Sequence, residues 1–251
     1  MRRVDIGNSQ AGPVFIWLHG WGQDHRSLLS LATLLKRQGH HILLDQPGFG
    51  QTAMLAKGAD TAAYADWLAD YIDTEAISAQ GPVILVGHSF GCRVSVQMAA
   101  RHPALVRAMI LISGAGLKRR RSTIWKLRAA GLKALGRLAR LCDRLFGTSL
   151  RQAYAKRFGS ADYRNAGDLR DTFVSVVNED LTAEAEAAAC PTLLLYGSED
   201  TETPPELGRK YASLIQGSRY IELEGYGHLD ILGRGAHQLE ARIKMFLKEI
   251  L

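Results

Sequence analysis

Short apolar runs alternate along the chain with stretches in which apolar residues recur every three or four positions. The runs are often β-branched and are bounded by glycine or polar residues, which is typical of buried strands. They predict strands at residues 14–18, 40–44, 83–87, 108–112, 192–196 and 219–223. The periodic stretches predict helices at residues 27–38, 61–73, 90–101 and 236–250. Strands that alternate with helices predict a mostly parallel central sheet with helices on both faces, which is an α/β fold.

The alternation stops after residue 116, and residues 117–187 predict several helices and almost no strand. We therefore expect three parts in the chain. Residues 1–116 form the first part of the α/β core, residues 117–187 form an inserted helical module, and residues 188–251 complete the core.

Within the inserted module, one stretch has the pattern of a basic amphipathic helix. Apolar or small residues recur at steps of three and four, at Ile124, Leu127, Gly131, Leu135, Leu138, Cys142 and Leu145. Basic residues fall on another face, at Lys126, Lys133, Arg137, Arg140 and Arg144. Residues 118–164 carry a net charge of +12 in a chain whose total is +6, so the excess of basic charge is confined to this module.

The overall composition, with 47% hydrophobic and 22% charged residues, is that of an ordinary globular protein. No apolar run reaches the roughly 20 residues that a membrane span requires, and the N-terminal residues lack the apolar region of a signal peptide. Cys92, Cys142 and Cys190 are too few and too scattered for a disulfide framework or a zinc site. We expect a cytoplasmic protein, with peripheral attachment at the inner membrane surface left open.

The most specific motif is Gly87-His88-Ser89-Phe90-Gly91, which lies between a predicted strand and a predicted helix. It is a Gly-x-Ser-x-Gly sequence in the strand–turn–helix context of a nucleophile elbow. Glycine is needed on both sides of the serine because the turn is sharp and a Cβ would crowd the strand and the helix that meet there. The turn would lift the Ser89 hydroxyl to the carboxyl edge of the sheet, so Ser89 is the candidate nucleophile.

A carboxylate and an imidazole follow two later strands. Asp200 comes after the run at 192–196, and His228 comes after the run at 219–223. A serine hydroxyl is a weak nucleophile unless a base removes its proton, and an imidazole suits that task near neutral pH. We therefore predict that His228 is the base and that Asp200 holds its ring in the correct tautomer.

Four motifs, spread over nearly the whole length, resemble those of the α/β-hydrolase superfamily, of the bacterial type that carries a cap domain. They are His19-Gly20-Trp21-Gly22, the loop 45–50, the elbow 87–91, and the pair formed by 197–200 and 227–228. The order Ser89, Asp200, His228 is also that of the superfamily. The resemblance implies a helical cap inserted after the family's sixth strand. It also implies a shortened leading hairpin, because only thirteen residues precede the first clear strand.

The resemblance further implies an oxyanion hole made of two backbone N–H groups. Phe90, the residue after the nucleophile, would supply one, and Trp21, in the turn after the first clear strand, would supply the other. Each donor of this kind typically contributes about 3–4 kcal/mol to transition-state stabilisation. The Trp21 side chain either lines the substrate pocket or fills the core.

Other residues compete for these roles. Glu199 adjoins Asp200, but the Gly-x-x-Asp spacing matches the superfamily and favours Asp200. We expect His88 to pack beside the sheet, His19 to shape its turn and His237 to lie on the surface.

Position 92 is often glycine in this superfamily, and we expect Cys92 to be a small buried helix residue rather than a reactive thiol. The loop 45–50 contains glycines but has neither the spacing nor the Lys-Ser/Thr of a phosphate cradle. We expect no nucleotide, no cofactor and no metal.

The basic module allows three interpretations. It is a lid whose apolar face covers the pocket, a surface for an anionic substrate or an acidic carrier such as acyl carrier protein, or an attachment to anionic membrane through the helix at 122–146. Nucleic acid is not expected as a partner, because the basic residues lack interleaved stacking aromatics.

Together these features predict a serine hydrolase that acts on a small-molecule acyl substrate, most simply a carboxylic ester, through an acyl-enzyme. Thioester, amide and carbon–carbon cleavage use the same machinery and stay open as alternatives. A noncatalytic binding protein on the same fold is the alternative from a different class.

Overall fold

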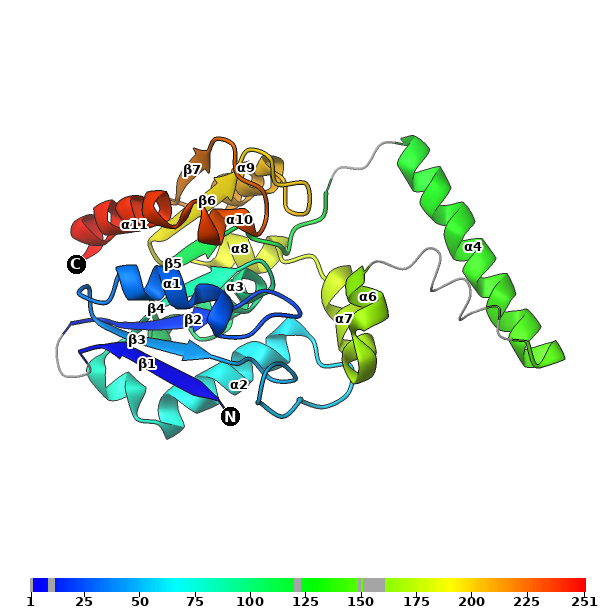
Figure 1. Ribbon diagram of the computed structural model, residues 1–251, viewed down its shortest axis with the longest axis horizontal. Coiled ribbons are helices and arrows are strands. Elements are labelled where there is room, and N and C mark those ends of the chain that lie inside the picture. The colour runs from blue at the N-terminus through cyan, green and yellow to red at the C-terminus, as the bar shows by residue number, and fades with distance from the viewer. Residues whose placement is uncertain (1, 9–11, 120–122, 149, 151–160) are drawn as a thin grey trace.

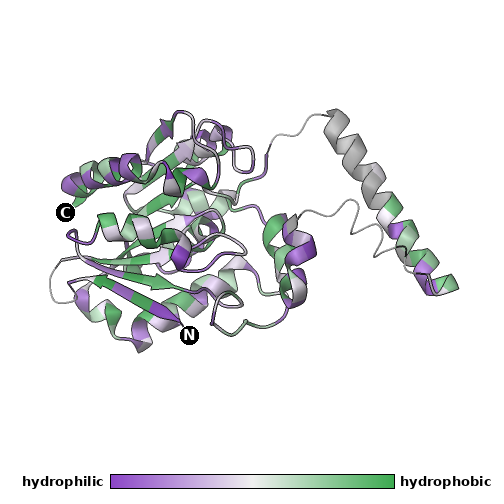
Figure 2. Ribbon diagram, in the orientation of Figure 1, coloured by the Kyte–Doolittle hydropathy of each residue, from purple (hydrophilic) through white to green (hydrophobic). Residues whose placement is uncertain are grey.

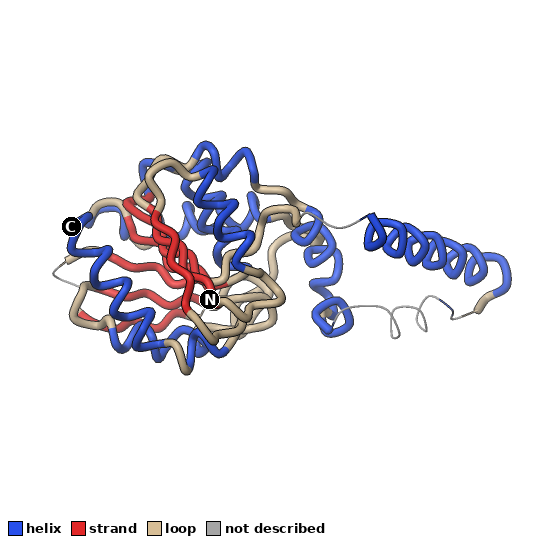
Figure 3. The backbone as a smooth tube through the Cα atoms, turned by 90° about the horizontal axis from the view of Figure 1, so that it is seen from above, coloured by secondary structure: helices blue, strands red, loops and turns tan. Residues whose placement is uncertain are grey.

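The computed structural model describes residues 2–8, 12–119, 123–148, 150 and 161–251 of the chain (Figure 1). A twisted sheet forms the centre, with helices on both faces. A helical segment extends away from one end of it (Figures 1 and 3).

The sheet has seven strands in the order β1-β3-β2-β4-β5-β6-β7. They are β1 Arg3–Gly7, β2 Val14–Leu18, β3 His40–Leu44, β4 Val83–His88, β5 Val106–Ile112, β6 Thr192–Gly197 and β7 Arg219–Leu223. All neighbouring strands are parallel except β1, which pairs antiparallel with β3. The six predicted strands and the α/β fold class are therefore confirmed, with boundaries that shift by at most two residues.

Strand β1 has no counterpart among the predicted strands. It lies at the sheet edge, its residues are only half-buried or exposed, and charged Arg3 and Asp5 alternate with apolar residues. A strand of this kind lacks the continuous apolar run that marks the central strands. In the described residues, β1 is the one strand that precedes β2.

Each sheet face carries its own core, because successive side chains of a strand point to opposite faces. On β2, for example, Ile16 belongs to the core beneath one set of helices and Trp17 to the core beneath the other. One face is covered by α1 Arg26–Leu34, α10 Asp230–Gly233 and α11 Ala236–Ile250. The other is covered by α2 Thr61–Thr74, α3 Phe90–Arg101, α8 Thr182–Ala187 and α9 Pro205–Leu214. Short 3₁₀ turns lie at Ile77–Gln80 and Pro103–Leu105.

The helix expected at 27–38 is shorter than predicted. It ends at Leu34, and residues 35–38 form turns in which the Gln38 N–H donates to the Leu35 carbonyl at 2.8 Å. Gly39 then takes a positive φ of 156°, and β3 begins at the next residue. The helix was predicted too long because the apolar periodicity continues through the turn that connects α1 to β3.

The described residues between β5 and β6 form helices joined by loops and contain no strand. They include α4 Thr123–Phe146, α6 Ala161–Asn165, a 3₁₀ turn at Gly167–Leu169, α7 Arg170–Asn178 and α8. Helix α8 belongs to the core, since Ala185 and Leu181 are buried in the same cluster as α3. Helix α7 reaches the edge of the core, where its Val176 is buried in the same cluster. Helix α6 lies on the outer side of α7, and α4 stands farther out (Figure 1).

None of the helices in the described ranges is both long enough and apolar enough to cross a membrane.

Candidate active site

Ser89 occupies a strained turn between β4 and α3. Its φ of 49° and ψ of −103° lie outside the regions that residues with a side chain normally adopt. The turn is held by its N–H, which donates to the Ile112 carbonyl at 3.1 Å. A Cβ at Gly91 would collide with the Leu18 carbonyl, and one at Gly87 would lie 2.7 Å from the Cys92 nitrogen. The local geometry is therefore that of the predicted elbow, including the reason for its two glycines.

Asp200 and His228 lie side by side, although 27 residues separate them in the chain. The His228 Nδ1 lies 2.8 Å from the Asp200 Oδ2, and both side chains are buried. Asp200 follows β6, and His228 follows β7, which is the parallel neighbour of β6 in the sheet. Adjacent carboxyl ends of parallel strands thus bring the carboxylate and the imidazole together.

Further donors hold the Asp200 carboxylate in its ionised form. The N–H groups of Glu202 and Thr203 donate to Oδ1 at 2.9 and 2.8 Å, and the Thr203 hydroxyl donates to Oδ2 at 2.8 Å. Burial by itself would raise the pKa of Asp200, but the hydrogen bonds from His228 and Thr203 outweigh it and lower that pKa. Asp200 therefore faces His228 as a fixed negative charge.

Thr203 is a residue that the sequence-based reasoning missed. Its hydroxyl lies 2.8 Å from the Asp200 Oδ2, 3.1 Å from the His228 Nδ1 and 2.9 Å from the Ser113 carbonyl. The sequence did offer an indication, because a threonine three residues after an aspartate can hydrogen-bond to its carboxylate within one turn of a loop. Glu202, also unanticipated, has its Oε2 3.6 Å from the His228 Nε2.

Ser89 and His228 line the same open cavity, which has a volume of about 1080 Å³. Its other walls come from the turn after β2, the loop after β3 and the inserted segment. These contribute Gly20, Trp21, Gly22, Gln23, Asp24, Gly48, Phe49, Gly50, Thr52, Met54, Asp162, Asn165, Ala166, Asp168 and Leu169. Glu202 and Leu229 lie on the same wall as His228. The described lining contains four acids and no Lys or Arg.

The two residues expected to form the oxyanion hole lie next to each other. The Gly91 N–H donates to the His19 carbonyl at 3.1 Å, which ties the first turn of α3 to the turn that contains Trp21. The Trp21 ring makes an edge contact with Phe90 at 5.4 Å between centroids, and further edge contacts with Phe49 and Phe173. The Trp21 side chain therefore lines the cavity and also packs in an aromatic cluster at the edge of the core.

The remaining histidines have structural surroundings. His88 is fully buried, its Nε2 donates to the His228 carbonyl at 3.0 Å, and burial lowers its pKa to about 3. The His19 Nε2 accepts from the Gln46 N–H at 3.0 Å, which fixes the turn after β2. The His237 side chain is 82% exposed on α11. These three positions agree with the roles expected from the sequence.

Cys92 is buried in α3, and its Sγ donates to the Gly87 carbonyl at 3.1 Å. Burial raises the pKa of this thiol well above its usual range, so it stays protonated. Cys92 is thus a small core residue, as expected.

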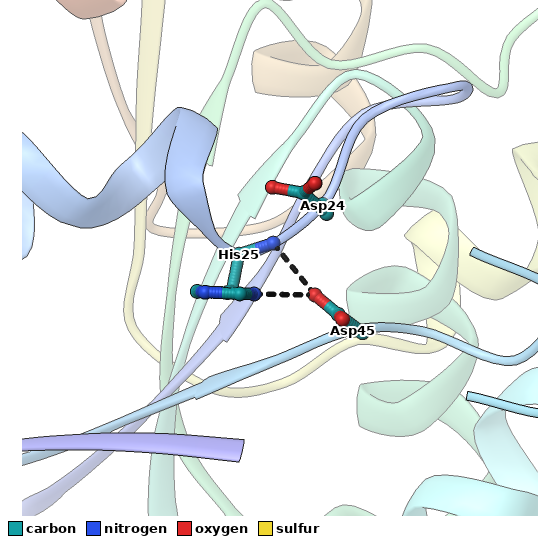
Figure 4. Close-up of side chains that lie close together, drawn as sticks. All are labelled: Asp24, His25 and Asp45. Atoms are coloured by element: carbon teal, nitrogen blue, oxygen red, sulfur yellow. Dashed lines mark hydrogen bonds and ion pairs between the residues drawn. The ribbon is translucent and has the colours of Figure 1, made fainter. Parts of the chain in front are cut away.

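One group of potential metal ligands lies beside the cavity. Asp24, His25 and Asp45 have ligand atoms within 4.8 Å of one another, and they are the one such group among the described residues (Figure 4). The Asp45 Oδ1 lies 3.0 Å from the His25 N–H and 2.6 Å from its Nδ1, and the Oδ2 accepts from the Gln51 N–H at 3.0 Å. Asp24 forms an ion pair with Arg26 at 2.5 Å. The carboxylates already have partners, and the group ties the loops after β2 and β3 together.

Ser89 on its strained elbow and His228, which is paired with the buried Asp200, line one open cavity at the carboxyl edge of a mostly parallel sheet. This arrangement is that of an α/β-hydrolase. A sequence profile described as alpha/beta hydrolase fold matches residues 13–234, and the chain belongs to that family.

Curated relatives of similar length are esterases by name. The pimeloyl-[acyl-carrier protein] methyl ester esterase of Neisseria meningitidis is 29% identical over 238 residues, which cover 86% of each chain. A local match of 36% identity reaches the 2-(acetamidomethylene)succinate hydrolase of Mesorhizobium japonicum, but it covers 44% of this chain and 41% of that one.

Solved structures share the fold at low sequence identity. A thermophilic esterase from Thermogutta terrifontis has a TM-score of 0.73 at 20% identity, covering 99% of this chain and 93% of that one. An enol-lactonase from Burkholderia xenovorans has the same TM-score and identity, covering 98% of this chain and 96% of that one. The protein is thus a hydrolase of this superfamily, with esterases among its relatives.

Proposed function

We propose that the protein is a serine hydrolase that cleaves a carboxylic ester through an acyl-enzyme. The observation that carries the proposal is the buried hydrogen bond between Asp200 and His228, in a cavity that Ser89 also lines. Asp200 accepts from Nδ1 and so leaves the Nε2 of His228 free to take a proton. Ser89 is presented by a strained elbow, and such strain is often found where a side chain must be held for chemistry.

In the proposed reaction, the Ser89 Oγ attacks the ester carbonyl carbon while His228 takes the hydroxyl proton. The N–H groups of Trp21 and Phe90 stabilise the oxyanion that forms on the carbonyl oxygen. Collapse of this intermediate breaks the bond to the alcohol, which leaves with the proton from His228. Water then attacks the acyl-enzyme, His228 takes the water proton, and the acid is released as Ser89 regains its hydrogen.

The cavity lining favours a substrate without a carboxylate near the reacting carbonyl. Asp162, Asp168 and Glu202 line the cavity, and no described lining residue is a Lys or Arg that would pair with an anionic group. A carboxylate bound among these acids would be repelled. This favours an uncharged ester over a dicarboxylate.

The proposal is tested with a serine-directed fluorophosphonate probe and a panel of p-nitrophenyl esters of rising chain length. The wild-type protein should be labelled at Ser89 and should hydrolyse the esters. Ser89→Ala should lose labelling and lose at least about 10⁴-fold in kcat with the fold intact. Ser213→Ala, an exposed position on α9, is the matched control and should retain both. Labelling that survives Ser89→Ala refutes the assignment, and a wild type that is never labelled points to a noncatalytic binding protein.

A second candidate is an ester carried by an acidic protein. It is favoured by the +12 charge of residues 118–164 and by the acyl-carrier substrate named for the Neisseria meningitidis relative. Charge-guided docking is screened by salt, so kcat/KM for a carrier-bound ester should fall with ionic strength while that for a p-nitrophenyl ester should not. Equal salt dependence for the two substrates contradicts this candidate.

A further inference from the structure

Helix α4 exposes large apolar side chains on a part of the chain that stands away from the core. Figures 1 and 3 show α4 apart from the sheet and from the helices that cover it. Its described large apolar residues have exposed fractions of 47% at Leu135, 57% at Leu138, 51% at Leu141, 66% at Leu145 and 73% at Phe146. Globular proteins rarely leave so many large apolar side chains exposed along one element without a use for them.

These apolar residues share one side of the helix. At about 100° per residue, Leu135, Leu138, Leu145 and Phe146 fall within one third of the circumference, and Leu141 lies about 40° beyond it, towards the basic side. Arg137 and Arg144 are exposed and lie on the opposite side. In the sequence, the apolar side continues towards the N-terminus of α4 through Ile124 and Leu127, and the basic side through Lys126 and Lys133. In the described part, Figure 2 shows hydrophobic and hydrophilic residues alternating along the helix.

We propose that α4 docks on an anionic lipid surface, lying in the plane of the headgroups. The leucines and Phe146 would enter the boundary of the acyl chains, and the basic residues would stay among the headgroup phosphates, which is the arrangement of interfacial amphipathic helices. The 24-residue helix is long enough for several turns to contact the surface at once. The proposal is independent of the proposed ester hydrolysis.

The other possible occupants of this face fit less well. A lid over the cavity would supply lining residues, but the described lining from the inserted segment comes from residues 162–169 and includes none of α4. An acidic protein would account for Arg137 and Arg144 but not for the exposed leucines opposite them. A second copy would bring two segments of net charge +12 together, and like charges repel. An anionic lipid surface satisfies both sides of the helix.

The test is sedimentation of the full-length protein with vesicles of phosphatidylglycerol and phosphatidylcholine, and with vesicles of phosphatidylcholine alone. The wild type should bind the anionic vesicles, and binding should weaken at high salt. Each basic residue near an anionic surface contributes about 1 kcal/mol, which is about fivefold in the constant for binding to the vesicles. Arg137→Glu with Arg144→Glu should therefore lower that constant at least about 25-fold. Leu138→Asp with Leu145→Asp should abolish binding at any salt concentration.

Two controls separate α4 from the general charge of the protein. Arg242→Glu with Lys248→Glu makes the same change of charge on exposed positions of α11, and Met245→Asp places an acid at a residue there that is 52% exposed. Both should bind vesicles within about twofold of wild type. Circular dichroism should be unchanged in every variant, and hydrolysis of a small neutral ester should be unchanged in the α4 variants, since no described residue of α4 lines the cavity.

Four outcomes would overturn the proposal. In the first two, the wild type does not bind anionic vesicles, or the α4 variants bind them as the wild type does. In the third, the protein forms a leucine-dependent dimer in size-exclusion chromatography and does not bind vesicles. In the fourth, it captures an acidic carrier protein through the arginines and does not bind vesicles. Ser89→Ala should lose ester hydrolysis and still bind vesicles, because the two proposals concern different parts of the chain. Failure of one proposal can therefore be told apart from failure of the other.

Discussion

At the scale of single residues, the surroundings of Asp200 decide how the candidate triad would work. Asp200 has four hydrogen-bond donors, from His228, the Glu202 backbone and both the backbone and side chain of Thr203. A carboxylate with this many donors stays ionised and does not rotate freely. It therefore holds the His228 ring by Nδ1. The neighbouring Glu199 is exposed, so it stands outside this network.

We predict that Asp200→Asn lowers kcat by roughly 10⁴-fold while the protein stays folded, because an amide would favour the wrong tautomer of His228. Glu199→Gln, one residue away, should keep activity within about twofold. Steady-state kinetics on a p-nitrophenyl ester, with circular dichroism as the folding check, measures both. If Glu199→Gln were the variant that lost activity, the assignment of the acid would be wrong.

At the scale of elements, α7 links the inserted segment to the cavity wall. Phe173 on α7 makes an edge contact with Trp21 at 5.1 Å between centroids, and Trp21 contacts Phe90 in turn. The end of α7 is anchored as well, since Arg93 on α3 donates to the Val176 carbonyl at 2.8 Å. The position of the inserted segment is therefore coupled by direct packing to the turn expected to supply an oxyanion donor.

From this contact we predict that Phe173→Ala lowers kcat for a small neutral ester about tenfold, because a loosened Trp21 turn would misplace a donor worth a few kcal/mol. Phe173→Tyr, which keeps the ring, should restore most of the rate. Val177→Ala on the same helix, at a position that is 48% exposed, is the control and should have little effect. A change confined to KM would show that Phe173 serves substrate binding instead.

At the scale of the whole molecule, buried neutral histidines make the fold sensitive to acid. Burial lowers the pKa of His41 to about 4 and that of His88 to about 3, and it also lowers the pKa of His19. In the unfolded chain each of these groups titrates near about 6.5. Their contribution to stability is therefore complete above that pH and is lost as the pH falls towards the folded-state values.

We therefore predict that Tm falls steadily as the pH is lowered from about 6.5 to 4.5, before most carboxylates titrate. Each unit of pKa difference corresponds to about 1.4 kcal/mol, so the combined loss should reach several kcal/mol. Thermal melts over a pH series measure this slope. His41→Gln should flatten it, and His237→Ala, at an exposed position, should leave it unchanged. A Tm that is constant down to pH 4.5 would contradict the prediction.

Much of the fold follows from local pattern. The central strands are predicted because residues buried on both sheet faces form continuous apolar runs, as in β2 and β4. The elbow at Ser89 is predicted because glycine is required wherever strand and helix meet too closely for a Cβ. Edge strand β1 is not predicted, since half-exposed positions carry charged side chains that erase the apolar signal.

Periodicity and turn chemistry are properties of neighbouring residues, and they are sufficient to predict the α/β fold, the serine elbow and the chain order of Ser89, Asp200 and His228. The folded structure was needed to find that Asp200 and His228 lie 2.8 Å apart and that Thr203 contacts both. It was also needed to find that α8 belongs to the core while α4 stands apart from it. The reason is that sheet order brings distant loops to one edge. The amphipathic pattern of α4 gives it an apolar side without specifying what that side contacts.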